Sequence, residues 1–530
     1  MSDVAPGHDA APTPEEPPVS PSRTPAETEA ALAAELHTVR PALLSPYTAG
    51  LPGARAAVLS RLWRGLAHDP LPWVSRREAG HDGLTLRLAD GRRLHGPRPD
   101  PYATATTVTE VGLDGTAYDH PAALMTALGL PHGRAFAAEL ADSVASLALS
   151  RADRFAPADP RTLWEWEQRI VDGHPFHPNC RSRPGFSVAE QLAYAPEHRP
   201  VVELGTVAVR EDDCRSTGVW PYREGGRLLI PVHPWQARHV LKDEQPLGSG
   251  TAAHPLMSLR TFAVPGGPHV KTALSARLTS SVRDISVYSI TSAATVSAFM
   301  ESMAGRLDGL LHITRTLGAV TTGSPDLAAV SRESPDLYAG PGERVVPVAA
   351  LAADVFPQSP QWLGEFGRLA LTVGLRLLDL GVALEAHGQN LLVVLSPTGA
   401  PVRLVYRDLA DIRISPARLA RHGIPAPGLT GRIVTDDETV LRSKLFGSLV
   451  AGALAATAGS TAALREALST AVRDLPRTPD LAALLQEPVP AKALTLMRLS
   501  PDRPGDLWAR LPNPLAGTTG PPAGTPADPA

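Results

Sequence analysis

One stretch of the chain, residues 384–409, constrains the fold more than any other. It reads LEAHGQNLLVVLSPTGAPVRLVYRDL, in which two apolar runs, Leu391–Leu395 and Val402–Tyr406, flank a turn-forming run. This pattern predicts an antiparallel hairpin. Pairing the two runs places Asn390 opposite Asp408, to within about one residue, and cross-strand neighbours lie ~5 Å apart. The sequence therefore predicts that an amide oxygen and a carboxylate meet at one end of this hairpin.

The same end of the predicted hairpin gathers four further polar residues: Glu385, His387, Gln389 and Arg407. Hard oxygen ligands beside a cationic residue suit Mg²⁺ that carries the phosphates of a nucleotide. For Asn390 or Asp408 alone, a role in a turn or an ion pair is the better interpretation. Their juxtaposition with Glu385 and His387 instead favours an active-site edge.

A second segment, residues 271–285, has the sequence KTALSARLTSSVRDI. In an extended conformation its side chains alternate between two faces. One face is apolar, and the other carries cations and hydroxyls: Lys271, Ser275, Arg277, Thr279, Ser281 and Arg283. A solvated sheet face is the alternative interpretation. No acidic residue interrupts the cations, however, and hydroxyl donors stand between them, so we expect a face that binds phosphate or carboxylate.

A third segment, GHPFHPNCRSRPGF at residues 173–186, contains three prolines that exclude a helix. His174 and His177 lack the companion ligands of the usual zinc motifs, so we expect no zinc site. The functional interpretation is that Arg181 and Arg183 donate to an anionic ligand. The alternative is a proline-stiffened loop whose histidines hydrogen-bond to the backbone.

Composition and charge limit the class of protein. A chain of 530 residues with 43% hydrophobic and 20% charged residues is typical of a globular protein with two or three subdomains. A net charge of −4 gives no case for nucleic-acid binding. Two cysteines imply no disulfide framework and fit a reducing compartment, so we expect a cytoplasmic protein. No apolar run reaches the ~18–20 residues of a membrane span, and we expect Leu445–Ala458 to be a packed helix.

The pattern along the chain predicts a mixed α+β fold. We expect hairpin turns at Asp90-Gly91 and Asp114-Gly115, strands at Val201–Val209, Arg227–Val232 and Val270–Tyr288, helices at Ser292–Leu317 and Pro360–Leu380, and a loop at 321–347. The expected organisation is a disordered segment (1–27), an N-terminal α+β subdomain (28–150), a central ATP- and substrate-binding domain (151–435), a helical C-terminal part (436–511) and a disordered tail (512–530).

Five motifs, in order, resemble the IucA/IucC family of NRPS-independent siderophore synthetases. They are GHPFHPNCRSRPGF, PVHPWQ, KTALSARLTSSVRDIS, EAHGQN and YRDL, and they span about residues 173–410. The helical C-terminal part resembles the FhuF-like segment of that family more weakly. The resemblance implies a three-part, cupped-hand fold with a mixed or antiparallel central sheet. It also implies an ATP-dependent ligase.

Enzymes of the resembled family adenylate a carboxylate of citrate or a related acid, release pyrophosphate, and pass the acyl group to an amine or hydroxyl. The resemblance implies ATP and Mg²⁺ as cofactors, small-molecule substrates, no nucleic-acid or membrane partner, and a homodimer as one oligomeric state. By motif position it implies catalytic roles for Lys271, Arg283 and His387, contacts to ATP or the acid from His174, Arg181, Ser280, Ser281, Arg283 and Gln389, and Mg²⁺ ligation by Glu385, Asn390 and Asp408.

Three positions depart from the family pattern. Arg181 stands where lysine is usual, which keeps the charge but replaces a point charge with a planar fork. Asp284 replaces a typical threonine and could draw Arg283 away from the substrate. Ala273 stands where serine is common.

Two other function classes remain open from the sequence. A phosphotransferase is the first, because an Asn and an Asp on neighbouring strands also describe a kinase-like metal site. No GxxxxGK[ST] or GxGxxG motif occurs to hold the nucleotide. The second is a non-catalytic binder or a ferric-siderophore reductase-like protein, although two cysteines are too few for a cluster held by four thiolates.

Overall fold

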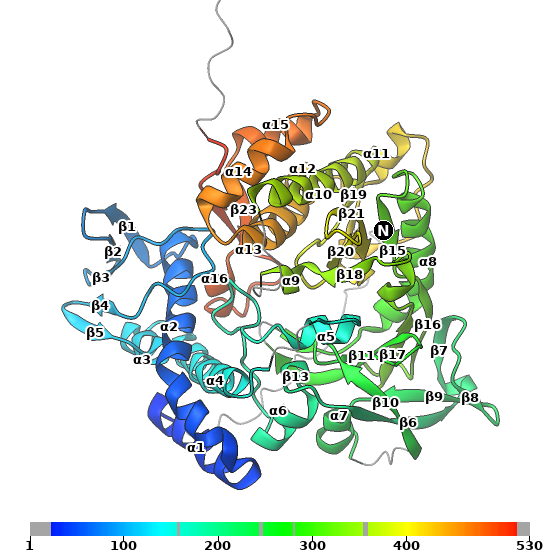
Figure 1. The fold of residues 1–530 in the computed structure, drawn as a ribbon, viewed down its shortest axis with the longest axis horizontal. Coiled ribbons are helices and arrows are strands. Elements are labelled where there is room, and N and C mark those ends of the chain that lie inside the picture. The colour runs from blue at the N-terminus through cyan, green and yellow to red at the C-terminus, as the bar shows by residue number, and fades with distance from the viewer. Residues whose placement is uncertain (1–22, 156–158, 243–246, 279–280, 353–358, 517–530) are drawn as a thin grey trace, which may run out of the picture.

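A computed structural model of the chain describes residues 23–155, 159–242, 247–278, 281–352 and 359–516. Figure 1 shows three parts in chain order: helices with a small sheet, then a large sheet, then a mainly helical part that carries the predicted hairpin. Helices and antiparallel sheets are mixed throughout, so the structure confirms the predicted α+β class.

The N-terminal part packs four helices against a five-stranded antiparallel sheet. Its elements are α1 (Pro25–Val39), α2 (Leu44–His68), α3 (Pro121–Leu128), α4 (Gly133–Ala152), β1 (Val74–Ala79), β2 (Leu84–Leu88), β3 (Arg93–Gly96), β4 (Val111–Leu113) and β5 (Thr116–Tyr118). Asp90-Gly91 joins β2 to β3, and Asp114-Gly115 joins β4 to β5. Both glycines have positive φ, which confirms the two predicted turns.

The central part is built on a nine-stranded antiparallel sheet of order β7-β16-β17-β12-β11-β10-β6-β9-β8. Its strands are β6 (Val202–Arg210), β7 (Arg215–Gly218), β8 (Arg223–Glu224), β9 (Arg227–Val232), β10 (Leu247–Pro255), β11 (Thr261–Ala263), β12 (His269–Thr272), β16 (Thr316–Thr321) and β17 (Ala328–Arg332), and its helices are α5 (Leu163–Gln168), α6 (Val188–Tyr194), α7 (Pro234–His239) and α8 (Val287–Ala304). The predicted strands near residues 201–209 and 227–232 are confirmed.

Besides the strand expected at Val270–Tyr288, which is divided into β12, β13 (Leu274–Leu278), β14 (Ser281–Arg283) and the start of α8, two secondary-structure predictions in this part were wrong. The helix expected at Ser292–Leu317 is α8 and ends at Ala304, because Asp308 and Gly309 take positive φ and turn the chain into new strands. The loop expected at 321–347 contains β17, since pairing with β12 and β16 on either side makes a strand of a short apolar run.

The predicted hairpin is present and lies in a four-stranded sheet of order β15-β21-β20-β18. Its strands are β15 (Leu311–Ile313), β18 (Arg344–Pro347), β20 (Leu391–Leu395) and β21 (Pro401–Tyr406). Leu391 pairs with Tyr406, and the Asn390 carbonyl accepts from the Arg407 N–H at 3.0 Å, so the expected register holds to within one residue. Helix α10 (Pro360–Leu380) ends at Gly381 with φ 107°, as the sequence predicts.

The C-terminal part adds short elements around one long buried helix. They are α9 (Val348–Leu351), β19 (Val382–Ala383), β22 (Arg413–Ile414), α11 (Pro416–Arg421), α12 (Glu438–Ser448), the π-helical η7 (Leu449–Leu454), α13 (Ala455–Ala458), α14 (Thr461–Ala471), α15 (Pro479–Gln486), β23 (Val489–Lys492), α16 (Leu494–Arg498) and β24 (Trp508–Leu511). The continuous helix Glu438–Ala458 is long and apolar enough to cross a membrane by length and composition, but 78% of its most apolar window is buried inside the molecule.

The ends of the ordered chain extend beyond the expected bounds. Residues 25–27, expected to be disordered, form the first turn of α1, which a capping box between Thr24 and Glu27 begins. The tail expected to be disordered from residue 512 is ordered through residue 516, where Leu515 is buried and the Pro512 carbonyl accepts from the Tyr102 hydroxyl at 2.9 Å. Residues 1–22 and 517–530 lie outside the described part of the chain.

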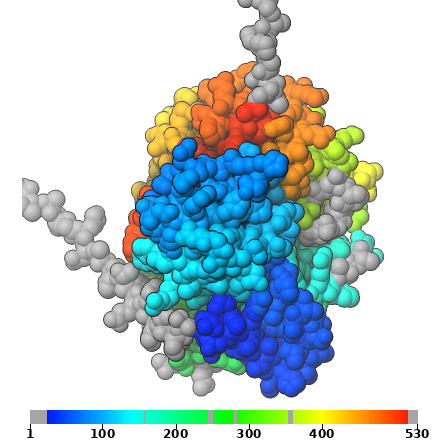
Figure 2. Space-filling model, turned by 90° about the vertical axis from the view of Figure 1, so that its left-hand side faces the viewer, coloured from blue at the N-terminus to red at the C-terminus, as the bar shows by residue number. Residues whose placement is uncertain are grey.

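The cores of the three parts interpenetrate. One hydrophobic core joins central residues with residues on both sides of the boundary expected at 435/436. The N-terminal core takes in Leu496, Leu499 and Ala509 from near the C-terminus. Figure 2 shows red C-terminal atoms directly beside the blue N-terminal part. The end of the chain therefore ties the first part to the last.

We expect Gly65→Ala to destabilise the protein at this junction. A Cβ at Gly65 of α2 would lie 2.1 Å from Thr495 Oγ1 of α16, far inside contact distance. Overpacking of this kind costs about 1–3 kcal/mol, measurable as a lowered urea midpoint. Gly50→Ala in the same helix is the matched control, because its Cβ would meet only the Ala148 carbonyl at 3.8 Å. An equal loss in both variants would contradict a tight α2–α16 contact.

Candidate active site

Asp408 lies at the centre of a group of buried cations. Its carboxylate accepts hydrogen bonds from Lys271 Nζ at 2.7 and 3.0 Å, and Arg332 Nη2 lies 4.0 Å away. Burial alone would raise the pKa of Asp408, but Lys271, Arg332 and Arg260 hold it well below its usual range. The carboxylate is therefore ionised and outnumbered by positive charges.

Arg260 and Arg283 complete this cation group. Arg260 Nη1 donates to the backbone carbonyl of Asp284 at 2.7 Å and also to that of Arg283. Burial lowers the pKa of Arg260 to about 10, against the attraction of Asp408. Burial likewise lowers the pKa of Arg283, while Asp408 and Glu385 raise it. Arg283 thus lies within electrostatic range of both carboxylates, while its Nη2 donates to the Leu278 carbonyl at 3.3 Å. The Asp284 carboxylate is attracted by Arg260.

The backbone at Asp408 is strained. With φ 69° and ψ 85°, it is one of the non-glycine residues in the left-handed region. Such a conformation costs on the order of 1–3 kcal/mol and persists only where the surroundings fix it. Here it turns the chain out of β21 and directs the carboxylate into the cation group.

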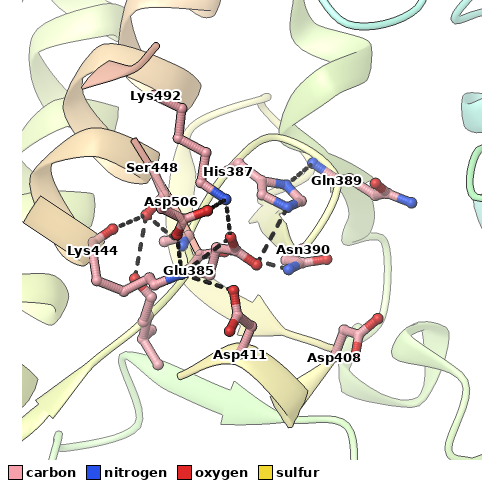
Figure 3. Close-up of polar contacts among 12 residues, drawn as sticks. Glu385, His387, Gln389, Asn390, Asp408, Asp411, Lys444, Ser448, Lys492 and Asp506 are labelled. Carbon is pink, nitrogen blue, oxygen red and sulfur yellow. Dashed lines mark hydrogen bonds and ion pairs between the residues drawn. The ribbon is translucent and has the colours of Figure 1, made fainter. Parts of the chain in front are cut away.

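Glu385 lies in a second, separate charge cluster (Figure 3). Its Oε1 accepts from Lys492 Nζ at 2.7 Å and from Lys444 Nζ at 3.4 Å. Lys444 also donates to Asp411 at 2.7 Å and to Asp506 at 3.1 Å. Oxygens of Glu385, Asp411 and Asp506 lie within 4.8 Å of one another, as in a metal site. The two ammonium groups, together with Arg413 at 3.0 Å from Asp411, already balance their charges, so this cluster is an ion-pair network.

The EAHGQN loop between β19 and β20 is fixed from two sides. Its backbone donates from Glu385 N to the Tyr406 hydroxyl at 3.2 Å and from Ala386 N to Ser448 Oγ at 2.8 Å. The π-helical η7 lies against the loop, because a Cβ at Gly452 would be 3.8 Å from His387 Cβ. π-Helical turns are frequent at functional sites. The long C-terminal helix thus positions His387.

Asn390 and Asp408 provide oxygens that fit Mg²⁺. Asn390 Nδ2 donates to the Glu385 carbonyl at 3.4 Å, and Figure 3 shows the amide oxygen on the other side, toward Asp408. An amide oxygen and an ionised carboxylate are suitable ligands for this ion. Glu385, the third residue predicted to bind the metal, instead binds two lysines. The structure therefore does not bring Glu385 and Asp408 together in the predicted group of three.

The predicted continuous cationic strand was wrong. The segment forms β12, then β13 (Leu274–Leu278) and β14 (Ser281–Arg283), and the last two pair with each other as a hairpin. Alternation holds only along an uninterrupted strand, and here the chain leaves β12 and then reverses. Arg277 consequently points to solvent near Glu139, while Lys271 and Arg283 remain in the site. Thr279 and Ser280, and the Ser281 side chain, lie outside the described residues.

The GHPFHPNCRSRPGF loop brings His174 to the site. The surrounding protein, and then His387 and Arg61, lower the pKa of His174, although the residue keeps an exposed side. His174 Nδ1 accepts from Phe176 N at 3.2 Å, and His177 Nδ1 accepts from Asn179 N at 3.0 Å. Both histidines therefore bond to backbone, as the structural alternative expects, and His174 lies within electrostatic range of His387.

Arg181 and Arg183 use their donors inside the fold. Arg181 donates to the carbonyls of Val171, at 2.7 Å, and Ile170. Arg183 Nη2 donates to the fully buried Glu197 at 2.5 Å, and Arg181 Nη1 lies 3.6 Å from the same carboxylate. The structure thus gives both arginines a role in holding the loop, and we leave Arg181 out of the proposed site.

We expect Glu197→Gln to destabilise the protein by about 3–5 kcal/mol at neutral pH, because it leaves two buried arginines without a counter-charge. Burial raises the pKa of Glu197, but Arg181 and Arg183 lower it far more. Its contribution is therefore present above the unfolded-state pKa of about 4.3 and lost as pH falls below it. The difference in unfolding free energy between variant and wild type should shrink in acid.

The control for this prediction is Glu211→Gln, which breaks an exposed pair with Arg223. Exposed pairs contribute about 0–1 kcal/mol. A loss at Glu197 no larger than the loss at Glu211 would contradict the structural role.

Six charged residues of the two clusters were not predicted from the sequence: Arg260, Arg332, Asp411, Lys444, Lys492 and Asp506. One signal could have found the lysines. The chain holds 50 basic residues, of which only Lys242, Lys271, Lys444 and Lys492 are lysines. Three of these four lie in the charge clusters around Asp408 and Glu385. In a chain that otherwise uses arginine, these three lysines stand where a compact charge fits between carboxylates.

Family models match two adjoining stretches of the chain. Residues 162–353 match the IucA / IucC family, and residues 360–507 match the family described as ferric iron reductase FhuF-like transporter. Together the stretches include every residue of the site described above. The boundary between them falls at 353–360, before the EAHGQN loop.

Curated relatives and solved structures agree with this assignment. The chain is 26% identical over 314 residues to the citryl-spermidine/3,4-dihydroxybenzoyl-citryl-spermidine:spermidine ligase of Bacillus anthracis, a match that covers 47% of the chain and 51% of that protein. The match thus spans about half the length of that relative. The fold is similar to petrobactin biosynthesis protein AsbB of B. anthracis str. Sterne (TM-score 0.74, 19% identity, covering 90% of this chain and 98% of that one).

A second solved structure with the same fold is ATP-bound aerobactin synthetase IucA of Klebsiella pneumoniae. Its TM-score is 0.65 at 19% identity, covering 87% of this chain and 99% of that chain. The three-part fold is therefore that of known siderophore synthetases.

Proposed function

This chain belongs to the IucA/IucC family, and we propose that it is an ATP-dependent siderophore synthetase. The reaction proposed is adenylation of a carboxylate of citrate or a related acid, followed by condensation with an amine or hydroxyl. One observation carries the proposal: an ionised Asp408 at the hairpin end beside Asn390, surrounded by Lys271, Arg260 and Arg332.

The cation group suits the first chemical step. A carboxylate oxygen of the acid attacks the α-phosphorus of ATP, and pyrophosphate leaves. Two anions must approach each other, and fixed positive charges in a water-poor site offset that repulsion. Arg332 is buried and Arg260 and Arg283 are half-buried, and these three guanidinium groups provide such charges. Burial lowers the pKa of Lys271 to about 7, so its ammonium depends on the Asp408 carboxylate that it contacts. Mg²⁺, when bound by Asn390 and Asp408, would supply further positive charge there.

The second step needs the two reactants held in place more than it needs a strong base. The nucleophile attacks the acyl carbon, loses a proton, and AMP leaves with the acyl-phosphate bond electrons. Burial lowers the pKa of His387, so this side chain is a neutral imidazole, and its Nε2 lies 4.0 Å from Glu385. We assign His387, His174 and Arg283 to binding the acid. Holding the acyl-adenylate and the nucleophile in place then accounts for much of the rate acceleration of this second step.

Relatives indicate the substrate class. The B. anthracis relative is named a ligase for citryl-spermidine and spermidine, and a Staphylococcus aureus relative is named L-2,3-diaminopropanoate--citrate ligase. We propose citrate or a citryl monoamide as the acid and a diamine or polyamine as the nucleophile. Both described cysteines are free thiols, which supports a cytoplasmic location. We also propose a homodimer, which light scattering after size-exclusion chromatography tests.

An assay of products tests the function. Enzyme, Mg²⁺·ATP, a panel of citrate-like acids and polyamines should yield pyrophosphate and AMP. ADP and a phosphorylated substrate instead would identify a phosphotransferase. Absence of ATP binding would favour the reductase-like alternative. Residues 360–507, which match the reductase-like family model, contain no cysteine that could hold an iron–sulfur cluster.

A further inference from the structure

Glu167 is a fully buried carboxylate that no step above uses. It lies on α5, outside the loop, the hairpin and both charge clusters. Its Oε1 accepts from Arg407 Nη2 at 2.6 Å, and its Oε2 accepts from Met257 N at 2.6 Å. Both oxygens are therefore engaged, and the carboxylate joins α5 to the β10–β11 turn and to the end of the hairpin.

Arg407 carries this contact into the active site. Its Nε donates to the Gln389 carbonyl at 2.9 Å, and its backbone N–H donates to the Asn390 carbonyl at 3.0 Å. It also directly precedes the strained Asp408. One buried guanidinium thus holds both chain segments that carry the oxygens suited to Mg²⁺.

The guanidinium depends on Glu167 for its charge balance. Arg407 Nη1 is buried and has no hydrogen-bond partner among the described residues. Arg332, also buried, lies within electrostatic range of Arg407, Glu167 and Asp408. Glu167 is the carboxylate that pairs directly with Arg407, whereas Asp408 pairs with Lys271. Loss of the Glu167 charge would leave Arg407 attracted toward the remaining carboxylates, including Asp408.

We propose that Glu167 is a positioning residue for the metal-nucleotide site: through Arg407 it fixes Asn390 and Asp408 in the arrangement that binds Mg²⁺·ATP. The inference rests on the proposed function. It assigns Glu167 no contact with substrate or metal.

Glu167→Gln tests this proposal because it keeps the shape and removes the charge. We expect the Mg²⁺ concentration for half-maximal ATP binding, measured by calorimetry without acid substrate, to rise about tenfold. ATP binding without Mg²⁺ should change less than twofold. Glu167→Asp, which keeps the charge, should lie closer to the wild type. Because the measurement involves no turnover, a wild type that binds Mg²⁺·ATP but releases no pyrophosphate would overturn the proposed function and leave this inference intact.

Glu165→Gln is the matched control, on the same helix. Glu165 Oε2 accepts from Arg161 N at 2.7 Å and Thr162 N at 3.0 Å, so the change weakens a cap at the start of the helix and removes a charge that contacts neither Arg407 nor the EAHGQN loop. It should lower the melting temperature without altering the Mg²⁺ requirement.

A double replacement, Glu167→Met with Arg407→Met, provides a folded test if Glu167→Gln does not fold, because apolar residues of similar size often replace a buried ion pair without loss of stability. It should fold and keep the raised Mg²⁺ requirement. An unchanged requirement in the folded Glu167 variants, or an equal rise in Glu165→Gln, would overturn the proposal.

Discussion

Asp408→Asn should lower the rate of acid-dependent pyrophosphate release by about 10²–10³-fold, the effect typical of removing one electrostatic group from a preorganised site. Asparagine keeps the size of the side chain and tolerates the left-handed backbone that Asp408 adopts at φ 69°. The substitution therefore removes the charge and little else.

Binding measurements should separate this effect from general damage. Lys271, Arg260 and Arg332 lose their shared counter-charge in the variant. We therefore expect ATP binding without Mg²⁺ to be unchanged or stronger, while Mg²⁺ no longer strengthens it. Asp308→Asn is the control, since Asp308 also has positive φ, at 52°, but forms an exposed pair with Arg376. Retained Mg²⁺-dependent activity in Asp408→Asn would contradict a metal role for this carboxylate.

Local patterns predicted the parts of the fold that local chemistry determines. The hairpin of residues 391–406 and the helix 360–380 lie at the predicted positions. Two apolar runs around a turn specify the hairpin, and apolar periodicity with a final glycine specifies the helix, in both cases without reference to the rest of the chain. The segment 328–332 did not, since only its two partner strands make it a strand.

The candidate site was predictable only where its residues lie close together in the sequence. Asn390 and Asp408 are brought together by one hairpin, and the pairing rule places them. Lys444 and Lys492 reach Glu385 from helix α12 and strand β23 of the C-terminal part, which no sequence period relates to the EAHGQN loop. The interpretation of Glu385 as a metal ligand was made without these two partners. Long-range ion pairs therefore determine which cations surround each carboxylate, including the Lys271 ammonium that contacts both oxygens of Asp408.

Arg283→Met should reduce kcat/KM for pyrophosphate release by about 10²–10³-fold, because Arg283 is a cation within electrostatic range of both Asp408 and Glu385. Methionine preserves the bulk of the buried stem without the charge. Arg283→Lys should fall between methionine and wild type, since it restores a charge but not the two-pronged donor geometry.

Arg277→Met on the same small hairpin is the matched control for Arg283. Arg277 is 42% exposed at its side chain and lies 4.0 Å from Glu139, away from the hairpin end. On the sequence pattern alone the two arginines share one face of one strand and should matter equally. The folded β13–β14 hairpin separates them, so only Arg283→Met should lose activity. Similar losses in both variants would show instead that the extended strand, with a continuous cationic face, is the arrangement that binds the anions.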